Sequence, residues 1–319
     1  MTLPPRPVTS SQIDFKLPSD RFWGTTALLP PTSHGLPYIA CIAHAITCFA
    51  LQPQTSMTIE DASNELLKMM GNPSEDGEEC GNHMEFGRFI LMIAEQIPYD
   101  HPAHRKLVTL INYLQKGNWY SDVFMMEINQ NMEIVFETSM DNSQLAAEMN
   151  RFVNYNAFLS QIDAHLPASL LSTAVLHFLN AFEMDYEHPE SVPNSPGIHN
   201  ALQAFQRGPQ EINAKGKGLL RTATVRVASL WMIQNATHFF ALLVSEPDRI
   251  TDWDHTTVWT RTGQRFRGDR FSRERWKFWK DGFRQVVDEA AADSYLGKEA
   301  GDALRAMNVV DGTDASGSW

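Results

Sequence analysis

Residues 252–255 place two carboxylates and an imidazole in one short segment. Asp252, Asp254 and His255 lie beside Trp253 and Trp259. Carboxylate and imidazole groups can transfer protons in general acid–base catalysis, and loops often carry such groups. We take the three titratable residues as candidate catalytic residues and the two tryptophans as candidate ligand-binding residues. The alternative is that this segment is a solvated polar turn.

A run of basic residues follows this loop. Residues 261–284 contain nine Lys or Arg and three Asp or Glu, a net charge of +6 in a chain whose formal net charge is −12. Aromatic residues are interleaved with them, a pattern suited to a phosphate-bearing ligand, an RNA segment or an acidic partner. The alternative is that the basic residues pair with the chain's own carboxylates while the aromatic side chains point inward. The candidate ligand-binding residues of this run are Arg261, Arg265, Arg267 and Arg270.

Cys41, His44 and Cys48 are spaced i, i+3 and i+7, which puts them on one face of a helix. Thiolate and imidazole on one face can ligate a metal or form a nucleophile–base pair. The alternative is that the small sulfur side chains fill a core helix. A structural zinc site also needs a fourth ligand from elsewhere in the chain, so we predict no metal site here.

Asp100, His101 and His104 lie at a predicted helix start, where the positive end of the helix dipole favours anions. As a metal pair, the His-x-x-His spacing is a weak signal, and capping and packing explain these residues. The chain has no P-loop, dinucleotide-binding fingerprint, G-x-S-x-G, H-E-x-x-H or paired aspartate-rich motif. We therefore expect no cofactor, and the lack of an aspartate-rich pair argues against a metal-dependent prenyl-diphosphate enzyme.

The composition is that of a soluble globular protein, with 319 residues, 43% hydrophobic and 20% charged. The negative net charge argues against general binding to nucleic acid or anionic membranes, which leaves a small molecule or an acidic protein as the expected partner. Residues 38–51 are too short to span a bilayer, and Arg221 and Arg226 interrupt the apolar run at 219–244. Three cysteines and the lack of an apolar signal segment indicate a cytoplasmic protein, and the oligomeric state is open.

The hydrophobic periodicity predicts an all-α protein without repeats or βαβ units. We expect a single irregular domain of about eight helices at residues 36–307, a disordered Pro-rich arm at 1–35 and a flexible tail at 308–319. The expected helices cover residues 38–51, 58–70, 83–97, 102–116, 141–165, 167–182, 218–244, 272–290 and 294–307, with another short helix near 200–205. Residues 118–140 are expected to be irregular, and residues 183–199 to form an acidic, Pro-rich connector.

The helix at 272–290 has the clearest start and buried face. Ser272 is the predicted N-cap, with Phe271 and Trp276 as a hydrophobic staple around it. Apolar residues then recur at steps of three and four, which predicts one buried stripe. The stripe consists of Trp276, Trp279, Phe283, Val286, Val287 and Ala290.

Three stretches of the sequence together resemble a known family. They are AEQIPYDHPAHRKLVTLINYL at 94–114, MNRFVNYNAFLSQI at 149–162 and SRERWKFWKDGF at 272–283. In sequence, order and spacing they resemble all-helical proteins of ascomycete fungi that are grouped as a domain of unknown function. The resemblance spans roughly residues 38–290, although residues 229–243 depart from the simpler Trp-bearing helix expected there.

This resemblance implies a fungal, intracellular, all-α domain of unassigned activity, and it transfers no catalytic residue. Members of such families often lie among specialised-metabolite genes, which associates the chain with that metabolism. Our first hypothesis is an accessory protein that binds a small apolar or anionic molecule. The second is a cyclase or isomerase assisted by Asp252, Asp254 and His255, and the third is an adaptor whose basic patch binds an acidic protein.

Overall fold

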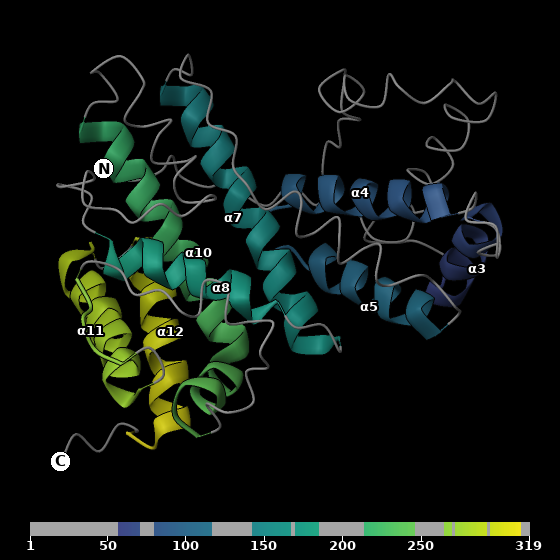
Figure 1. Ribbon diagram of the computed structural model, residues 1–319. Coiled ribbons are helices and arrows are strands. Elements are labelled where there is room, and N and C mark those ends of the chain that lie inside the picture. The colour runs from purple at the N-terminus through teal and green to yellow at the C-terminus, as the bar shows by residue number, and fades with distance from the viewer. Residues whose placement is uncertain are drawn as a thin grey trace. The chain divides into compact units, whose positions relative to one another are not determined.

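The computed structural model describes residues 57–70, 80–116, 142–166, 170–184, 214–245, 265–269, 272–291 and 294–313. These residues form eight α-helices and two π-helical turns, with no β-strand among them (Figure 1). The prediction of an all-α fold with about eight helices is therefore confirmed. The predicted arm at 1–35, the predicted helix at 38–51 and the segment 118–140 lie outside the described residues.

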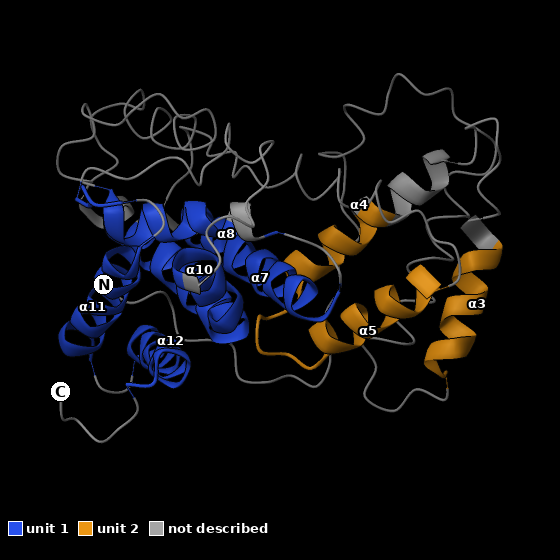
Figure 2. Cartoon of the chain, turned by 60° about the horizontal axis from the view of Figure 1, so that its bottom comes forward, with its two compact units in different colours: residues 1–5, 133–319 blue, residues 6–132 orange. Residues whose placement is uncertain are grey.

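The chain divides into two compact units (Figure 2). Unit 2 comprises residues 6–132 and contains α3 (Ile59–Met70), α4 (Cys80–Gln96) and α5 (Ala103–Lys116). Unit 1 comprises residues 1–5 and 133–319 and contains the remaining described helices. The single domain expected at 36–307 remains a prediction.

Helix starts in unit 2 follow the predicted capping chemistry. The Thr58 hydroxyl accepts the backbone N–H of Asp61 at 3.1 Å, and the Asp61 carboxylate accepts the N–H of Thr58 at 3.3 Å. This reciprocal pair satisfies two amides that the first turn of α3 leaves without intrahelical partners. α5 begins at Ala103, one residue after the predicted first position at Pro102, whereas α4 begins at Cys80, three residues before its predicted start.

The two histidines at the start of α5 have structural roles. His101 Nδ1 accepts the backbone N–H of Ala103 at 3.1 Å, and His104 Nε2 is hydrogen bonded to the carbonyl of Ala94 at 3.1 Å. Burial lowers the pKa of His104 to about 4, so its imidazole is neutral at physiological pH. Capping and packing therefore account for this His-x-x-His pair, as expected from the sequence.

Unit 1 is arranged around one long helix, α10 (Ala214–Phe240), which ends in the π-helical turn η4 (Ala241–Ser245). α10 packs against α7 (Asn142–His165), α8 (Leu171–Phe178) and α12 (Tyr295–Asp311). Because it contacts neighbours on several sides, most residues of its central part, 223–232, are buried. Asn235 kinks it with φ −127° and ψ 17°, and its Nδ2 donates to the Ser160 carbonyl of α7 at 3.0 Å.

Within the described part of the chain, one helix, Arg221–Val244, is long and apolar enough to cross a membrane. Over half of its most apolar window, 56%, is buried inside the protein. It also carries Arg226, whose guanidinium is bound to a carboxylate in the protein interior. These contacts are those of a central core helix.

An aromatic cluster joins α8 and α10 to α11 (Arg273–Glu289) through the π-helical turn η2 (Leu179–Glu183). Phe178 stacks on Trp279 with ring centroids 4.6 Å apart and meets Phe239 edge-on at 5.0 Å. Phe182 meets Phe283 edge-on at 4.7 Å. Such pairs add roughly 0.5–1.5 kcal/mol each to the burial of the rings. The predicted stripe of α11 is thus buried at Trp276, Trp279, Phe283 and Val286, and half-buried at Val287 and Ala290.

The last helix extends beyond its predicted end. α12 continues to Asp311, four residues past Met307, and stops at Gly312 in the left-handed conformation with φ 71°. Glycine adopts this backbone conformation without the Cβ clash that other residues meet. Residues 308–313 therefore form a helix end, which the prediction of a flexible tail at 308–319 did not include.

Candidate functional site

Most of the predicted site residues lie outside the described residues. This holds for the candidate catalytic residues Asp252, Asp254 and His255 and for the possible metal face of Cys41, His44 and Cys48. It also holds for four candidate ligand-binding residues, so their roles remain predictions. These four are Trp253, Trp259, Arg261 and Arg270.

Arg265 and Arg267 are described, and both are exposed. Phe266 between them is 6% exposed and packs on Phe278 of α11 with ring centroids 5.3 Å apart. The phenylalanine is thus buried while both flanking arginines are exposed. The Arg-Phe-Arg sequence thus docks onto α11 through its middle residue and presents two guanidinium groups.

The turn after this segment closes tightly around the phenylalanine ring. A Cβ atom placed at Gly268 would lie 2.7 Å from Cζ of Phe266, closer than side-chain carbons approach one another. A side chain at this position would push the ring off α11. Glycine therefore avoids a contact here that would displace the Phe266 ring.

Arg265 of this segment is hydrogen bonded through its N–H to the carbonyl of Glu183, which forms a buried ion pair with Arg275. Arg275 Nε donates to Oε1 at 2.7 Å and its terminal nitrogen donates to Oε2 at 3.2 Å, and both side chains are 0% exposed. Trp279 Nε1 donates to the same Oε1 at 2.7 Å. The bidentate geometry and the third donor satisfy the buried charges, which a lone buried carboxylate would not tolerate.

Glu183 was not expected in this position. The sequence predicted that it begins an acidic, Pro-rich connector, whereas it is fully buried at the end of η2. The available signal was its spacing: it follows Leu179 by four residues and so continues the buried face of α8. The pairing with Arg275 joins residues 92 positions apart, and no local pattern indicates it.

The basic run therefore separates into buried and exposed members. Arg275 pairs with Glu183, Lys280 with Asp311 at 2.7 Å, and Arg284 with Asp281 on the helix surface. The exposed remainder among the described residues consists of Arg265, Arg267, Arg273 and Lys277, which we call the α11 basic surface. The alternative that the basic residues pair with the chain's own carboxylates is therefore confirmed for Arg275, Lys280 and Arg284. Ligand binding by the exposed remainder stays a prediction.

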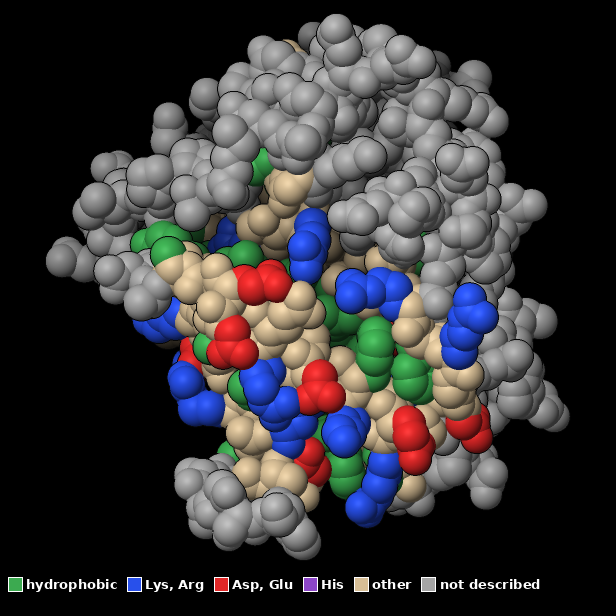
Figure 3. Space-filling model, turned by 90° about the vertical axis from the view of Figure 1, so that its left-hand side faces the viewer, with side chains coloured by type: hydrophobic (Ala, Val, Ile, Leu, Met, Phe, Trp, Pro, Cys, Tyr) green, Lys and Arg blue, Asp and Glu red, His purple; other side chains and the backbone are tan. Residues whose placement is uncertain are grey.

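The exposed face that includes α11 carries charges of both signs. Figure 3 shows Lys and Arg side chains interspersed with Asp and Glu, without a large area of one sign. Asp269, Glu274 and Asp281 are the exposed acids between the basic positions. An anion bound here would meet individual guanidinium and ammonium groups, and a broad positive field is lacking.

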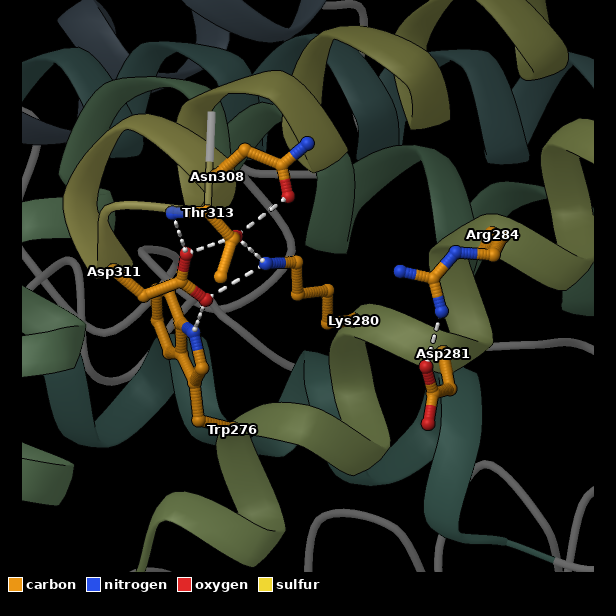
Figure 4. A network of polar contacts seen from close by, with 7 residues as sticks. All are labelled: Trp276, Lys280, Asp281, Arg284, Asn308, Asp311 and Thr313. Carbon is orange, nitrogen blue, oxygen red and sulfur yellow. Dashed lines mark hydrogen bonds and ion pairs between the residues drawn. The ribbon is translucent and has the colours of Figure 1, made fainter. Parts of the chain in front are cut away.

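A second polar network ties the end of α12 to α11 (Figure 4). The Asp311 carboxylate accepts Lys280 Nζ at 2.7 Å, Trp276 Nε1 at 3.0 Å and the backbone N–H of Thr313 at 3.1 Å. Burial alone would raise the pKa of Asp311, but the hydrogen bonds from Lys280, Thr313 and Trp276 hold this pKa below its ordinary value. The network is therefore a structural clasp built on an ionised carboxylate.

Two other buried titratable groups in unit 1 have shifted pKa values. Burial lowers the pKa of His177 to about 3; neither ring nitrogen has a hydrogen-bond partner, and the ring meets Phe152 edge-on at 5.5 Å. Burial raises the pKa of Asp163 to about 6, although the N–H of Leu170, 2.7 Å away, and the charge of His238 oppose the shift. His177 thus packs as a neutral ring. No group of three or more His, Cys, Asp or Glu able to hold a metal occurs among the described residues.

Comparison with known proteins places the chain in a family. Residues 88–283 match the family model described as "Protein of unknown function (DUF3632)". The chain belongs to this family. The match covers most of the described helices and includes the stretches at 94–114, 149–162 and 272–283 that suggested a domain of unknown function. No curated protein and no solved structure matches the chain.

Proposed function

We propose that this member of the DUF3632 family is a non-catalytic accessory protein that binds a small anionic molecule on the α11 basic surface. The observation that carries the proposal is the docking of Arg265 and Arg267 on either side of the buried Phe266. Guanidinium groups bind phosphate and carboxylate groups with paired, charge-assisted hydrogen bonds. Two such groups held on one short segment suit a ligand bearing phosphate or carboxylate.

The start of α11 supports an anionic ligand. Arg273 occupies the first position of the helix, where the partial positive charge of the helix dipole disfavours a cation. Glu274 is the acidic residue of the first turn, and Arg275 is neutralised in the interior by Glu183. A bound anion would offset the repulsion that remains at Arg273.

The wider setting is proposed from the resemblance in sequence. The resemblance of three sequence stretches to ascomycete proteins supports a fungal origin and a role in specialised metabolism as an accessory factor. The apolar part of the hypothesis, a ligand held by Trp253 and Trp259, depends on the loop outside the described residues. The exposed arginines favour the anionic part.

The proposal is tested by titrating inorganic pyrophosphate into the full chain by isothermal titration calorimetry at low ionic strength. The variant Arg265→Ala/Arg267→Ala is compared with Arg221→Ala/Arg305→Ala, which removes two exposed cations elsewhere in unit 1. We expect the first variant to bind at least about tenfold more weakly than wild type, because it loses two charge-assisted contacts. The second should bind within about twofold of wild type. Equal weakening in both variants, or no binding by wild type, would contradict the proposal.

A second candidate function is docking to an acidic protein. The exposed basic residues of the α11 basic surface favour it, since basic side chains complement the carboxylates of an acidic partner. Native mass spectrometry of protein purified gently from its own host distinguishes the candidates. A retained small organic anion supports the first, and a co-purifying acidic polypeptide supports the second.

A further inference from the structure

Glu183 contacts both parts of the α11 basic surface. Its backbone carbonyl accepts the N–H of Arg265 at 3.0 Å, which fixes the short segment that carries Arg265 and Arg267. Its carboxylate accepts Arg275 and Trp279, which lie in the first two turns of α11 beside Arg273 and Lys277. One residue thus holds the two chain segments that supply the exposed basic groups.

We propose that Glu183 is the positioning residue of the α11 basic surface, and this inference rests on the anion-binding function proposed above. Glu183 is fully buried and its carboxylate oxygens are occupied by Arg275 and Trp279, so it does not compete with a ligand for the exposed arginines. It acts on the ligand through the backbone segments that it joins.

The geometry of η2 explains why this residue reaches both segments. Glu183 is the last residue of the π-helical turn, and Met184 after it is extended with φ −85° and ψ 143°. The carbonyl of Glu183 is therefore at a helix end, where no further turn of the helix follows, and it accepts the N–H of Arg265. Its side chain meanwhile continues the buried face toward α11. A single-turn π-helix often marks a functional position, and here it places these two acceptors.

Unit 1 contains a matched control for this role. Arg226 of α10 and Glu299 of α12 form a second buried bidentate pair, with Nε to Oε2 at 2.8 Å and the terminal nitrogen to Oε1 at 2.9 Å. This pair has the same chemistry and similar burial, but it joins two core helices, neither of which carries a member of the basic surface. Glu299→Gln therefore reproduces the loss of a buried carboxylate charge without touching the docking of residues 265–277.

The experiment compares Glu183→Gln with Glu299→Gln in the full chain, at a temperature where circular dichroism shows both variants folded. The first readout is affinity for inorganic pyrophosphate by calorimetry. The second is amide hydrogen exchange in peptides covering residues 265–277. We expect Glu183→Gln to bind about tenfold more weakly and to exchange faster in these peptides, because its neutral amide cannot hold the Arg275 guanidinium as the carboxylate does. Glu299→Gln should match wild type in both readouts.

The outcomes separate this inference from the proposed function. If wild type does not bind pyrophosphate, the proposed function fails, and the exchange comparison alone decides whether Glu183 positions the segment. If Glu183→Gln matches Glu299→Gln in both affinity and exchange, the positioning role is wrong. Should Glu183→Gln fail to fold, Glu183→Asp replaces it, since it keeps the charge but shortens the reach by one methylene. An unchanged exchange pattern in the folded Glu183→Asp variant would also overturn the inference, and faster exchange with partly retained binding would support it.

Discussion

The two buried Arg–Glu pairs of unit 1 have nearly the same bond geometry but different surroundings. The pair between Glu183 and Arg275 lies at the end of a π-helical turn, and Glu183 also binds the indole N–H of Trp279. The pair between Arg226 and Glu299 joins the interiors of two α-helices. In both, the partners are far apart in sequence, with separations of 92 and 73 residues.

This comparison shows that a buried ion pair must be judged by its further contacts. The desolvation of two charges offsets most of their attraction, so burial of a pair is weak support for added stability. What distinguishes Glu183 is that its backbone carbonyl also accepts the N–H of Arg265 and so connects the core to an exposed segment. Arg226 and Glu299 instead fix how α10 packs against α12.

Removing the carboxylate of each pair should produce the largest losses in the free energy of unfolding. Glu183→Ala leaves the Arg275 guanidinium and the Trp279 N–H without acceptors in the interior, so we expect a loss of about 3–5 kcal/mol in the free energy of unfolding. Glu299→Ala leaves a single guanidinium that is slightly exposed, and we expect a smaller loss, about 2–4 kcal/mol. Urea unfolding followed by tryptophan fluorescence measures both, and a larger loss for Glu299→Ala would reverse the comparison.

Replacing both partners of each pair sharpens the difference. Arg226→Met/Glu299→Leu exchanges one pair for apolar side chains of similar size, and we expect a stability within about 1 kcal/mol of wild type. Glu183→Leu/Arg275→Met still leaves the Trp279 N–H unpaired, so it should remain about 1–3 kcal/mol less stable than wild type. Equal stabilities of the two double variants would mean that the indole contact contributes nothing. The matching single variants serve as controls in the same unfolding series.

The sequence predicted the local features of this region and missed the long-range ones. The N-cap at Ser272 is confirmed, because its hydroxyl accepts the N–H of Arg275 at 3.1 Å, and the stripe of α11 is buried over its first four members. Capping and helical periodicity are set by residues within one or two turns, so they can be recognised along the chain. The burial of Glu183 depends on a partner 92 residues away. The sequence predicted instead that Glu183 begins an acidic connector.

The candidate site was predicted in part. The exposed positions of Arg265 and Arg267 agree with a role in ligand binding, which remains a proposal. The division of the basic run into buried and exposed members could not be predicted, since it requires knowing that Asp311 and Glu183 meet α11. The proposed catalytic loop with Asp252, Asp254 and His255 lies outside the described residues and stays a prediction.

Two helical glycines test the packing beside the two pairs. A Cβ at Gly282 of α11 would lie 2.6 Å from Cδ1 of Phe182, whose ring is packed against Phe283, so Gly282→Ala should destabilise the protein by about 1–3 kcal/mol. A Cβ at Gly301 of α12, two residues after Glu299, would meet nothing closer than 3.9 Å. Gly301→Ala should therefore stabilise the helix by up to about 1 kcal/mol. Thermal unfolding of the two variants should give shifts of opposite sign, and a Gly282→Ala variant that is not destabilised would refute the close approach of η2 to α11.

The pair between Lys280 and Asp311 lies nearer to solvent and should show the smallest effect, with a clear dependence on pH. The pKa of Asp311 is lowered in the folded protein, so its contribution to stability is present above the ordinary carboxylate pKa of about 4 and is lost as pH falls through the folded value. Asp311→Asn keeps an acceptor but removes the charge, and we expect a loss of about 1 kcal/mol at pH 7.

The same substitution should cost progressively less as the solution is acidified, because wild type then loses the charge that the variant already lacks. Urea unfolding of both proteins at a series of pH values between 7 and 3 measures this convergence. Asp302→Asn is a suitable control, since Asp302 pairs with Arg305 on the surface of α12 and away from the clasp. A stability difference between wild type and Asp311→Asn that stays constant down to pH 3 would show that the clasp depends on hydrogen bonding alone, and that the charge of Asp311 does not help to hold α12 against α11.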